Sequence, residues 1–189
     1  MNPLKVLVVM LFVMSMGLFA QQKVDYSKEP GYFDYSKFLP AKIGEPTTEV
    51  NLEEPLLKMA GQMAVDKKEN VGNMISALKL VKVNEFETEQ KESPEMQSAI
   101  ESMDKDLLEK QWDRIIKTKS KNDFTNVYVK SGSDGKFMGL VVTSLNKNGK
   151  ATFVNIVGRI DLETIKQLSE QFNFSTGEKT KEKVEKEKK

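Results

Sequence analysis

The sequence contains no cysteine and no histidine among its 189 residues. Without cysteine the chain can form no disulfide, no thiolate nucleophile and no thiolate metal site, and it has no acylation site of the lipoprotein type. Without histidine it lacks the usual general base, the commonest ligand of transition metals and any Ser-His-Asp triad. We therefore predict no cofactor and no bound metal, although an all-oxygen calcium or magnesium site stays open.

An excess of charge of either sign is also missing. The chain carries 29 basic and 28 acidic residues, for a formal net charge of +1. A neutral chain has no electrostatic reason to bind nucleic acid or an anionic membrane, so we expect neither as a partner. The missing residue types also argue against catalysis, and we predict a protein that is not an enzyme and has no catalytic residues.

The N-terminus has the order of a secretory signal peptide. Lys5 precedes an apolar run from Val6 to Ala20, and the polar residue Gln21 follows it. The run of about 15 residues is shorter than the roughly 20 that a membrane-spanning helix needs, which favours a cleaved signal over an anchor. We predict cleavage between Ala20 and Gln21. The mature protein is then exported, periplasmic or secreted, with no stable membrane anchor.

Composition divides the chain into four segments. They are a signal peptide over 1–20, an irregular leader over 21–46, a single domain over 47–173 and a charged disordered tail over 174–189. The leader is expected to pack on the domain through its aromatic rings, with a ligand or glycan platform as the alternative. These rings belong to Tyr32, Phe33, Tyr35 and Phe38.

Alternating apolar and polar residues predict strands in the domain. The expected strands cover 47–52, 78–87, 112–118, 124–130, 137–145 and 151–160. The pair Asn148-Gly149 between the last two is typical of a tight hairpin. The segment Ser131–Gly135 is interpreted as a turn, because it lacks the lysine of a phosphate loop and the spaced acids of a calcium loop.

Helices are expected after Glu53, over 71–77, after Ser93 and after Asp161. Ser93 followed by a proline is a typical helix start, and Met96, Ile100, Met103 and Leu107 recur at the spacing of one helix face. Gly61 in the first helix predicts close packing against a neighbouring element. Arg159 could bind an anion near the last helix, but capping by Asp161 is the favoured interpretation.

These elements predict one α+β domain. We expect an antiparallel sheet of about five or six strands, packed by two main helices that cover one face. The order of the C-terminal half, a strand meander followed by a helix, supports this fold class.

Three stretches of the domain resemble a known family. They are EVNLEEPLLKMAGQMA, ISALKLVKVNEF and VNIVGRIDLETIKQL. Together they resemble the exported bacterial family of domain of unknown function 4252, found mainly in Bacteroidetes, over about Val50 to Leu168. The resemblance implies export and this fold, and it transfers no catalytic residue. It also implies lipoprotein relatives, from which this cysteine-free chain departs.

The leading functional hypothesis is an exported envelope protein that binds or scaffolds an unknown protein or small-molecule partner. One alternative is a carrier of a small apolar ligand, with a pocket lined by methionines such as Met59, Met63, Met96 and Met103. The other is a hydrolase that uses paired carboxylates. An apolar cavity would favour the carrier, whereas a bare edge strand or a flat exposed sheet face would favour a binding module.

Overall fold

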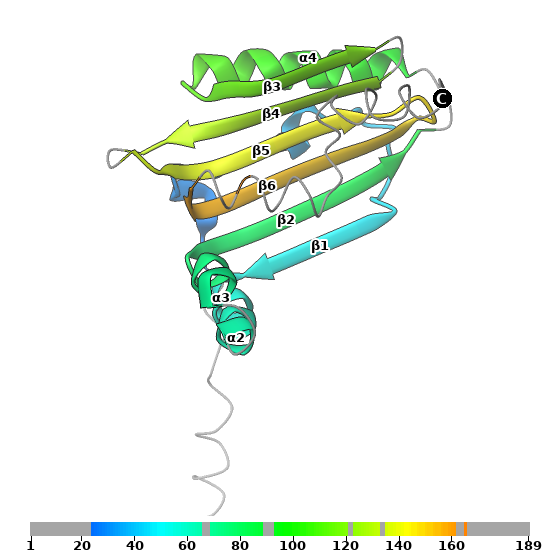
Figure 1. Ribbon diagram of the computed structural model, residues 1–189. Helices are drawn as coiled ribbons and strands as arrows, with labels where there is room; N and C mark the ends of the chain where they lie inside the picture. Colours follow the sequence, from blue (N-terminus) through cyan, green and yellow to red (C-terminus); the bar gives the residue numbers. More distant parts are fainter. Residues whose placement is uncertain are drawn as a thin grey trace, which may run out of the picture.

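The computed structural model is an α+β fold built on one antiparallel sheet, which confirms the predicted fold class (Figure 1). It describes residues 24–65, 69–88, 93–120, 123–132, 135–161 and 165. The sheet has six strands in the order β1-β2-β6-β5-β4-β3. The strands are β1 (Thr48–Glu53), β2 (Leu78–Glu87), β3 (Asp113–Ser120), β4 (Asp123–Ser131), β5 (Phe137–Leu145) and β6 (Lys150–Ile160). The helices are α2 (Glu54–Val65), α3 (Glu69–Ser76), α4 (Pro94–Glu109), η1 (Tyr26–Lys28) and η2 (Tyr35–Phe38).

Strand positions follow the sequence pattern closely. The observed bounds of β2 and β5 are those predicted, and the other four strands agree within two residues at each end. The predicted hairpin joins β5 to β6, where Gly149 has φ +83° and its N–H donates to the Asn146 carbonyl at 3.0 Å. Local turn chemistry and alternation therefore account for most of the sheet. Of the predicted turn after β4, residues 133–134 lie outside the described residues.

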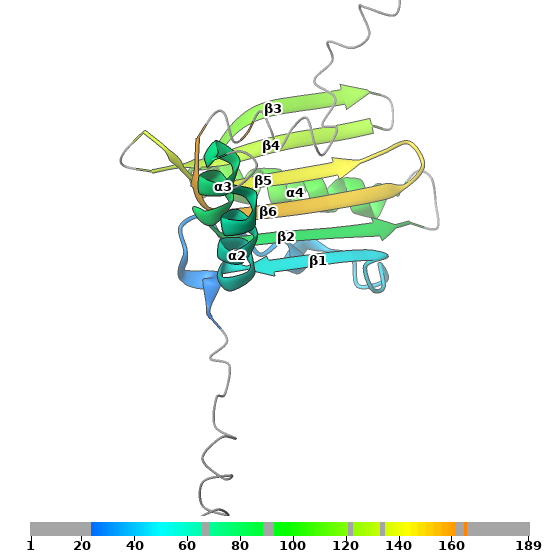
Figure 2. The same cartoon turned by 60° about the horizontal axis from the view of Figure 1, so that its bottom comes forward.

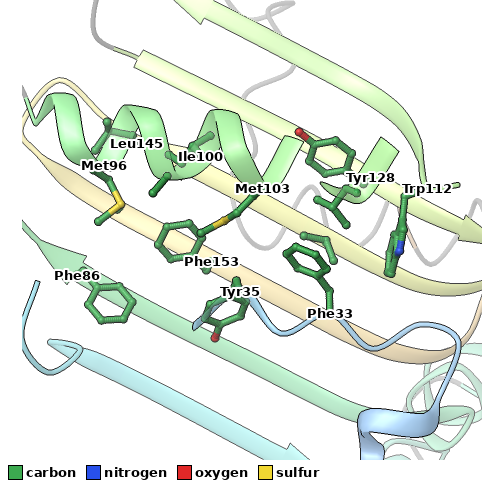
Figure 3. Close-up of a cluster of buried hydrophobic side chains, with 14 residues drawn as sticks. Phe33, Tyr35, Phe86, Met96, Ile100, Met103, Trp112, Tyr128, Leu145 and Phe153 are labelled. Carbon is green, nitrogen blue, oxygen red and sulfur yellow. The ribbon is translucent and has the colours of Figure 1, made fainter. Parts of the chain in front are cut away.

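Helix α4 covers one side of the sheet, which we name the α4 face. The Ser93 hydroxyl accepts a hydrogen bond from the Met96 N–H at 3.2 Å, which confirms the predicted N-cap. The predicted apolar side of the helix is buried, and Figure 3 shows Met96 and Met103 reaching toward Phe153 of β6. This packing forms the larger part of the hydrophobic core.

The leader lies on the same face as α4. Phe33 and Tyr35 are buried, and their rings lie 6.4 Å from Trp112 and 5.3 Å from Phe153 between centroids (Figure 3). Tyr32 and Phe38 are partly buried against the core. The prediction that aromatic rings hold the leader to the domain is confirmed.

Helices α2 and α3 pack on the opposite side, which we name the α2 face. Leu57 and Ile75 contact a second cluster that includes Val83, Val154 and Ile156. We expected both main helices on one face, and this expectation is wrong. The physical reason is that the central strands are apolar on both sides, so each face needs a cover.

Close packing between α2 and α3 confirms the interpretation of Gly61. A Cβ atom at this position would lie 2.1 Å from the Ser76 hydroxyl oxygen and 2.6 Å from the Gly72 carbonyl oxygen. The two helices thus form a tight hairpin at one end of the sheet, as Figure 2 shows.

Several predicted segments lie outside the described residues. They are the signal peptide, the charged tail and most of the final helix. Of that helix, Ile165 is described, and its N–H donates to the Asp161 carbonyl at 3.1 Å. In the described part of the chain, none of the helices has the length and hydrophobicity that crossing a bilayer requires.

Candidate functional site

Strand β1 forms an exposed edge of the sheet. In the described structure it pairs with β2 alone, and five of its six residues are exposed (Figure 1). An edge strand presents backbone N–H and C=O groups that can pair with a further strand. The structure thus has the bare edge strand that addition of a partner strand would require.

The side chains of β1 alternate between the two faces of the sheet. Leu52 lies opposite Val81, and Val50 lies opposite Val83, so both point to the α2 face. Glu49 and Glu53 occupy the alternate positions and point to the α4 face. The edge is therefore apolar on one face and acidic on the other.

Helix α2 follows β1 directly in the chain and also carries exposed apolar side chains. Leu56, Met59 and Met63 recur at steps of three and four residues and are 49%, 54% and 70% exposed. Among the described residues, eight large hydrophobic side chains are exposed, and five of them lie between positions 50 and 63. We name these five the apolar strip: Val50, Leu52, Leu56, Met59 and Met63. A gathering of this kind is typical of an interaction surface.

On the α4 face, the same edge borders an open cleft of about 440 Å³ between β1, β2 and the leader. We name it the acidic cleft. Its lining carries three carboxylates and one ammonium group, from Asp25, Glu49, Glu53 and Lys82. The rings of Tyr26 and Tyr32 complete the wall. Burial, together with the charges of Asp34 and Asp25, raises the pKa of Tyr32.

Contacts that the leader accepts from α2 and β2 hold the leader's side of the acidic cleft in place. The Glu54 N–H, at the start of α2, donates to the Tyr26 hydroxyl at 3.3 Å. The Lys79 ammonium group on β2 contacts the Glu29 carboxylate at 2.7 Å. Asp25 caps η1 by accepting from the Ser27 N–H at 3.1 Å, and the hydrogen bonds from Ser27 lower the pKa of Asp25.

The predicted methionine pocket is wrong. Met96 and Met103 are fully buried in the core beneath α4, whereas Met59 and Met63 are exposed on α2 at the other face. The four side chains therefore line no common cavity. A hollow of about 60 Å³ lies beside α4 and β3, and none of the four methionines lines it. Its lining includes the polar residues Asp104, Lys117 and Asn126.

The remaining sequence predictions concern the signal cleavage bond, Arg159 and a metal site. Ala20 and Gln21, the predicted cleavage pair, lie outside the described residues. Arg159 is exposed, and its backbone N–H donates to the Ala77 carbonyl at 3.2 Å. Within the described ranges, no group of three or more acidic residues is arranged to hold a metal ion.

Glu49 and Glu53 were not identified as site residues from the sequence. The pattern Glu49-Val50-Asn51-Leu52-Glu53 contains the signal, because strict alternation assigns acids to one face and apolar residues to the other. The contribution of Asp25 and Tyr26 had no such signal, since it depends on how the leader folds back onto β2.

Comparison with known proteins identifies one family. The family described as Domain of unknown function (DUF4252) matches residues 44–168. This range contains the whole sheet and the apolar strip, whereas the part of the cleft contributed by η1 precedes it. No curated protein and no solved structure matches the chain.

Proposed function

The chain belongs to the DUF4252 family, and we propose that it is a non-enzymatic binding domain that takes an extended segment of a partner protein at the β1 edge. In this proposal the protein is exported into the bacterial envelope and loses residues 1–20. The observation that supports this proposal is the open edge of β1, which has the apolar strip on one face and the acidic cleft on the other. Strand addition uses such an edge, with backbone hydrogen bonds for affinity and alternate side chains for specificity.

The two borders define the chemistry of the partner segment. In a strand added beside β1, successive side chains point to opposite faces. Side chains on the α2 face would meet Val50, Leu52 and the exposed side of α2, and are therefore apolar. Side chains on the α4 face would meet Glu49 and Glu53, and are therefore basic. The preferred segment alternates apolar and basic residues.

A pair of catalytic carboxylates needs one member whose pKa is raised, so that it can donate a proton. Hydrogen bonds from Ser27 lower the pKa of Asp25, so Asp25 does not suit the role of that proton donor. The cleft also suits a small apolar ligand poorly, because such ligands are held in largely apolar, enclosing pockets.

A peptide pair tests this proposal. One synthetic peptide of about eight residues alternates Val and Lys, and the other has the same composition in two blocks. We expect the alternating peptide to bind at least about tenfold more tightly, measured by isothermal titration calorimetry. Equal affinity of the two peptides would contradict strand addition.

Matched variants locate the binding. Leu52→Lys removes apolar contact on the α2 face and sets a charged ammonium group against the peptide valines, so it should weaken binding of the alternating peptide by about tenfold or more. Leu108→Lys is the control, because Leu108 is 44% exposed, similar to Leu52 at 39%, but lies on α4. If both variants weaken binding equally, the site is not the β1 edge.

A further inference from the structure

Strand β3, at the opposite edge of the sheet, carries the pattern that the β1 edge selects. Lys117 and Lys119 lie opposite Asn126 and Phe124 of β4, so they point to the α4 face. Ile116 lies opposite Val127 and packs in the cluster on the α2 face. The strand is therefore basic on one face and has an apolar residue on the other.

The two edges have opposite charge. β1, with sequence TEVNLE, contains two acids and no base, for a charge of −2. β3, with sequence DRIIKTKS, contains three bases and one acid, for a charge of +2. Arg114 forms an ion pair with Asp104, and Lys117 lies near the same carboxylate. Both lysines are exposed, and Lys119 lies over the Phe124 ring at 5.3 Å.

Strand direction permits the two edges to join. The six strands are antiparallel, so β1 and β3 at the two ends of the order run in opposite directions. A second copy in the same orientation, placed beyond β3, would set its β1 antiparallel to β3. The α4 face of one copy would then continue into the α4 face of the next.

We propose that the segment bound at the β1 edge is β3 of a second copy of this chain, so that copies join edge to edge. This inference rests on the proposed function and names its partner. The favoured register sets Leu52 opposite Ile116 and Glu49 opposite Lys119, with Val50 opposite Thr118 and Asn51 opposite Lys117. Apolar contact then lies on the α2 face and opposite charges meet on the α4 face.

Such a contact is heterologous, because it uses a different surface on each copy. A heterologous contact closes into a ring only if its rotation permits, and otherwise extends as an open array. Charges on edge strands commonly prevent such pairing. Here their opposite signs on the two edges favour it, which gives a scaffolding domain a means of assembly.

Charge reversal tests the inference directly. One variant carries Glu49→Lys with Glu53→Lys, and the other carries Lys117→Glu with Lys119→Glu. We expect the mass of the purified wild-type protein to rise with concentration in sedimentation velocity at low salt, and to fall again at high salt. Each variant alone has two edges of like sign and should remain monomeric.

An equimolar mixture of the two variants restores complementary edges and should assemble again. The control is Lys42→Glu with Lys105→Glu, which makes the same change in net charge as the Lys117→Glu with Lys119→Glu variant, at exposed residues outside both edge strands. This control should assemble as the wild type does. Circular dichroism checks that all variants fold.

Three results would overturn the inference: a wild-type mass that does not change with concentration, self-association that survives both reversals, or a mixture that fails to assemble. A monomeric wild type that still binds the alternating peptide refutes self-pairing and keeps the proposed function. A wild type that neither assembles nor binds the peptide refutes both.

Discussion

The side-chain amide of Asn155 hydrogen-bonds to the backbone of Phe33, a residue 122 positions earlier in the chain. Its Oδ1 accepts from the Phe33 N–H at 3.0 Å, and its Nδ2 donates to the Gly31 carbonyl at 2.9 Å. Asn155 is fully buried on β6. This contact ties the leader to the centre of the sheet, and the leader in turn supplies one wall of the acidic cleft.

Asn155→Ala should destabilise the fold by about 2–3 kcal/mol, because it leaves a buried N–H and a buried carbonyl without their partner. The measurement is the free energy of unfolding in urea. Asn126→Ala is the matched control, since Asn126 is also a buried asparagine but makes a longer hydrogen bond, at 3.5 Å, to Thr143. Equal losses for the two variants would contradict an anchoring role for Asn155.

The sheet could be predicted from the sequence because its signals are local. Alternation marks each strand, the Asn148-Gly149 pair marks the hairpin, and the Ser93 cap marks the start of α4. The face on which each helix packs is not a local property. In α2, Leu57 packs on the sheet whereas Leu56, Met59 and Met63 are exposed, so the apolar pattern of the helix does not identify its packed side. The helix packs opposite α4 because both faces of the sheet are apolar.

The candidate site was less predictable for the same reason. Alternation in β1 contains the division into an acidic and an apolar face, but an edge strand and a central strand can share this pattern. Asn155 is a polar residue inside a strand of apolar neighbours, and its partners Gly31 and Phe33 are distant in sequence. A single sequence contains no signal for that pairing.

Protonation of Asp104 should destabilise the protein at acid pH. Burial acts to raise the pKa of Asp104, but hydrogen bonds from Tyr128 and Arg114 outweigh it and hold the pKa below its usual value. A carboxyl group with a lowered folded-state pKa stabilises the fold above its unfolded pKa, and this contribution is lost as the pH falls through the folded value. The relevant window therefore lies below about pH 4.

We expect Asp104→Asn to lower the free energy of unfolding by about 1–2 kcal/mol at neutral pH. This difference from the wild type should shrink as the pH falls below about 4, measured by urea unfolding at a series of pH values. Tyr128→Phe removes one donor to the carboxylate, so it should move the wild-type acid transition to higher pH. A difference for Asp104→Asn that is constant with pH would argue against this account.

Gly61→Ala should destabilise the protein although alanine is the better helix former. Alanine gains about 1 kcal/mol in helix propensity over glycine. Its methyl group, however, would lie far inside contact distance of the Gly72 carbonyl and the Ser76 hydroxyl. Overpacking of this kind costs about 1–3 kcal/mol, so the melting temperature should fall. Adding Ser76→Ala should recover only part of the loss, because the Gly72 backbone remains. A rise in melting temperature for Gly61→Ala would show that the helices separate freely.

The methionines should divide into two classes. Met96→Ala and Met103→Ala remove fully buried side chains beneath α4 and should each cost about 2–5 kcal/mol in unfolding free energy. Met59→Ala and Met63→Ala remove side chains that are 54% and 70% exposed, and should change stability by less than about 0.5 kcal/mol. The second pair should nevertheless weaken binding of the alternating peptide, because both side chains belong to the apolar strip. A large loss of stability at Met63 would instead mean that the exposed side of α2 serves the fold and not a partner.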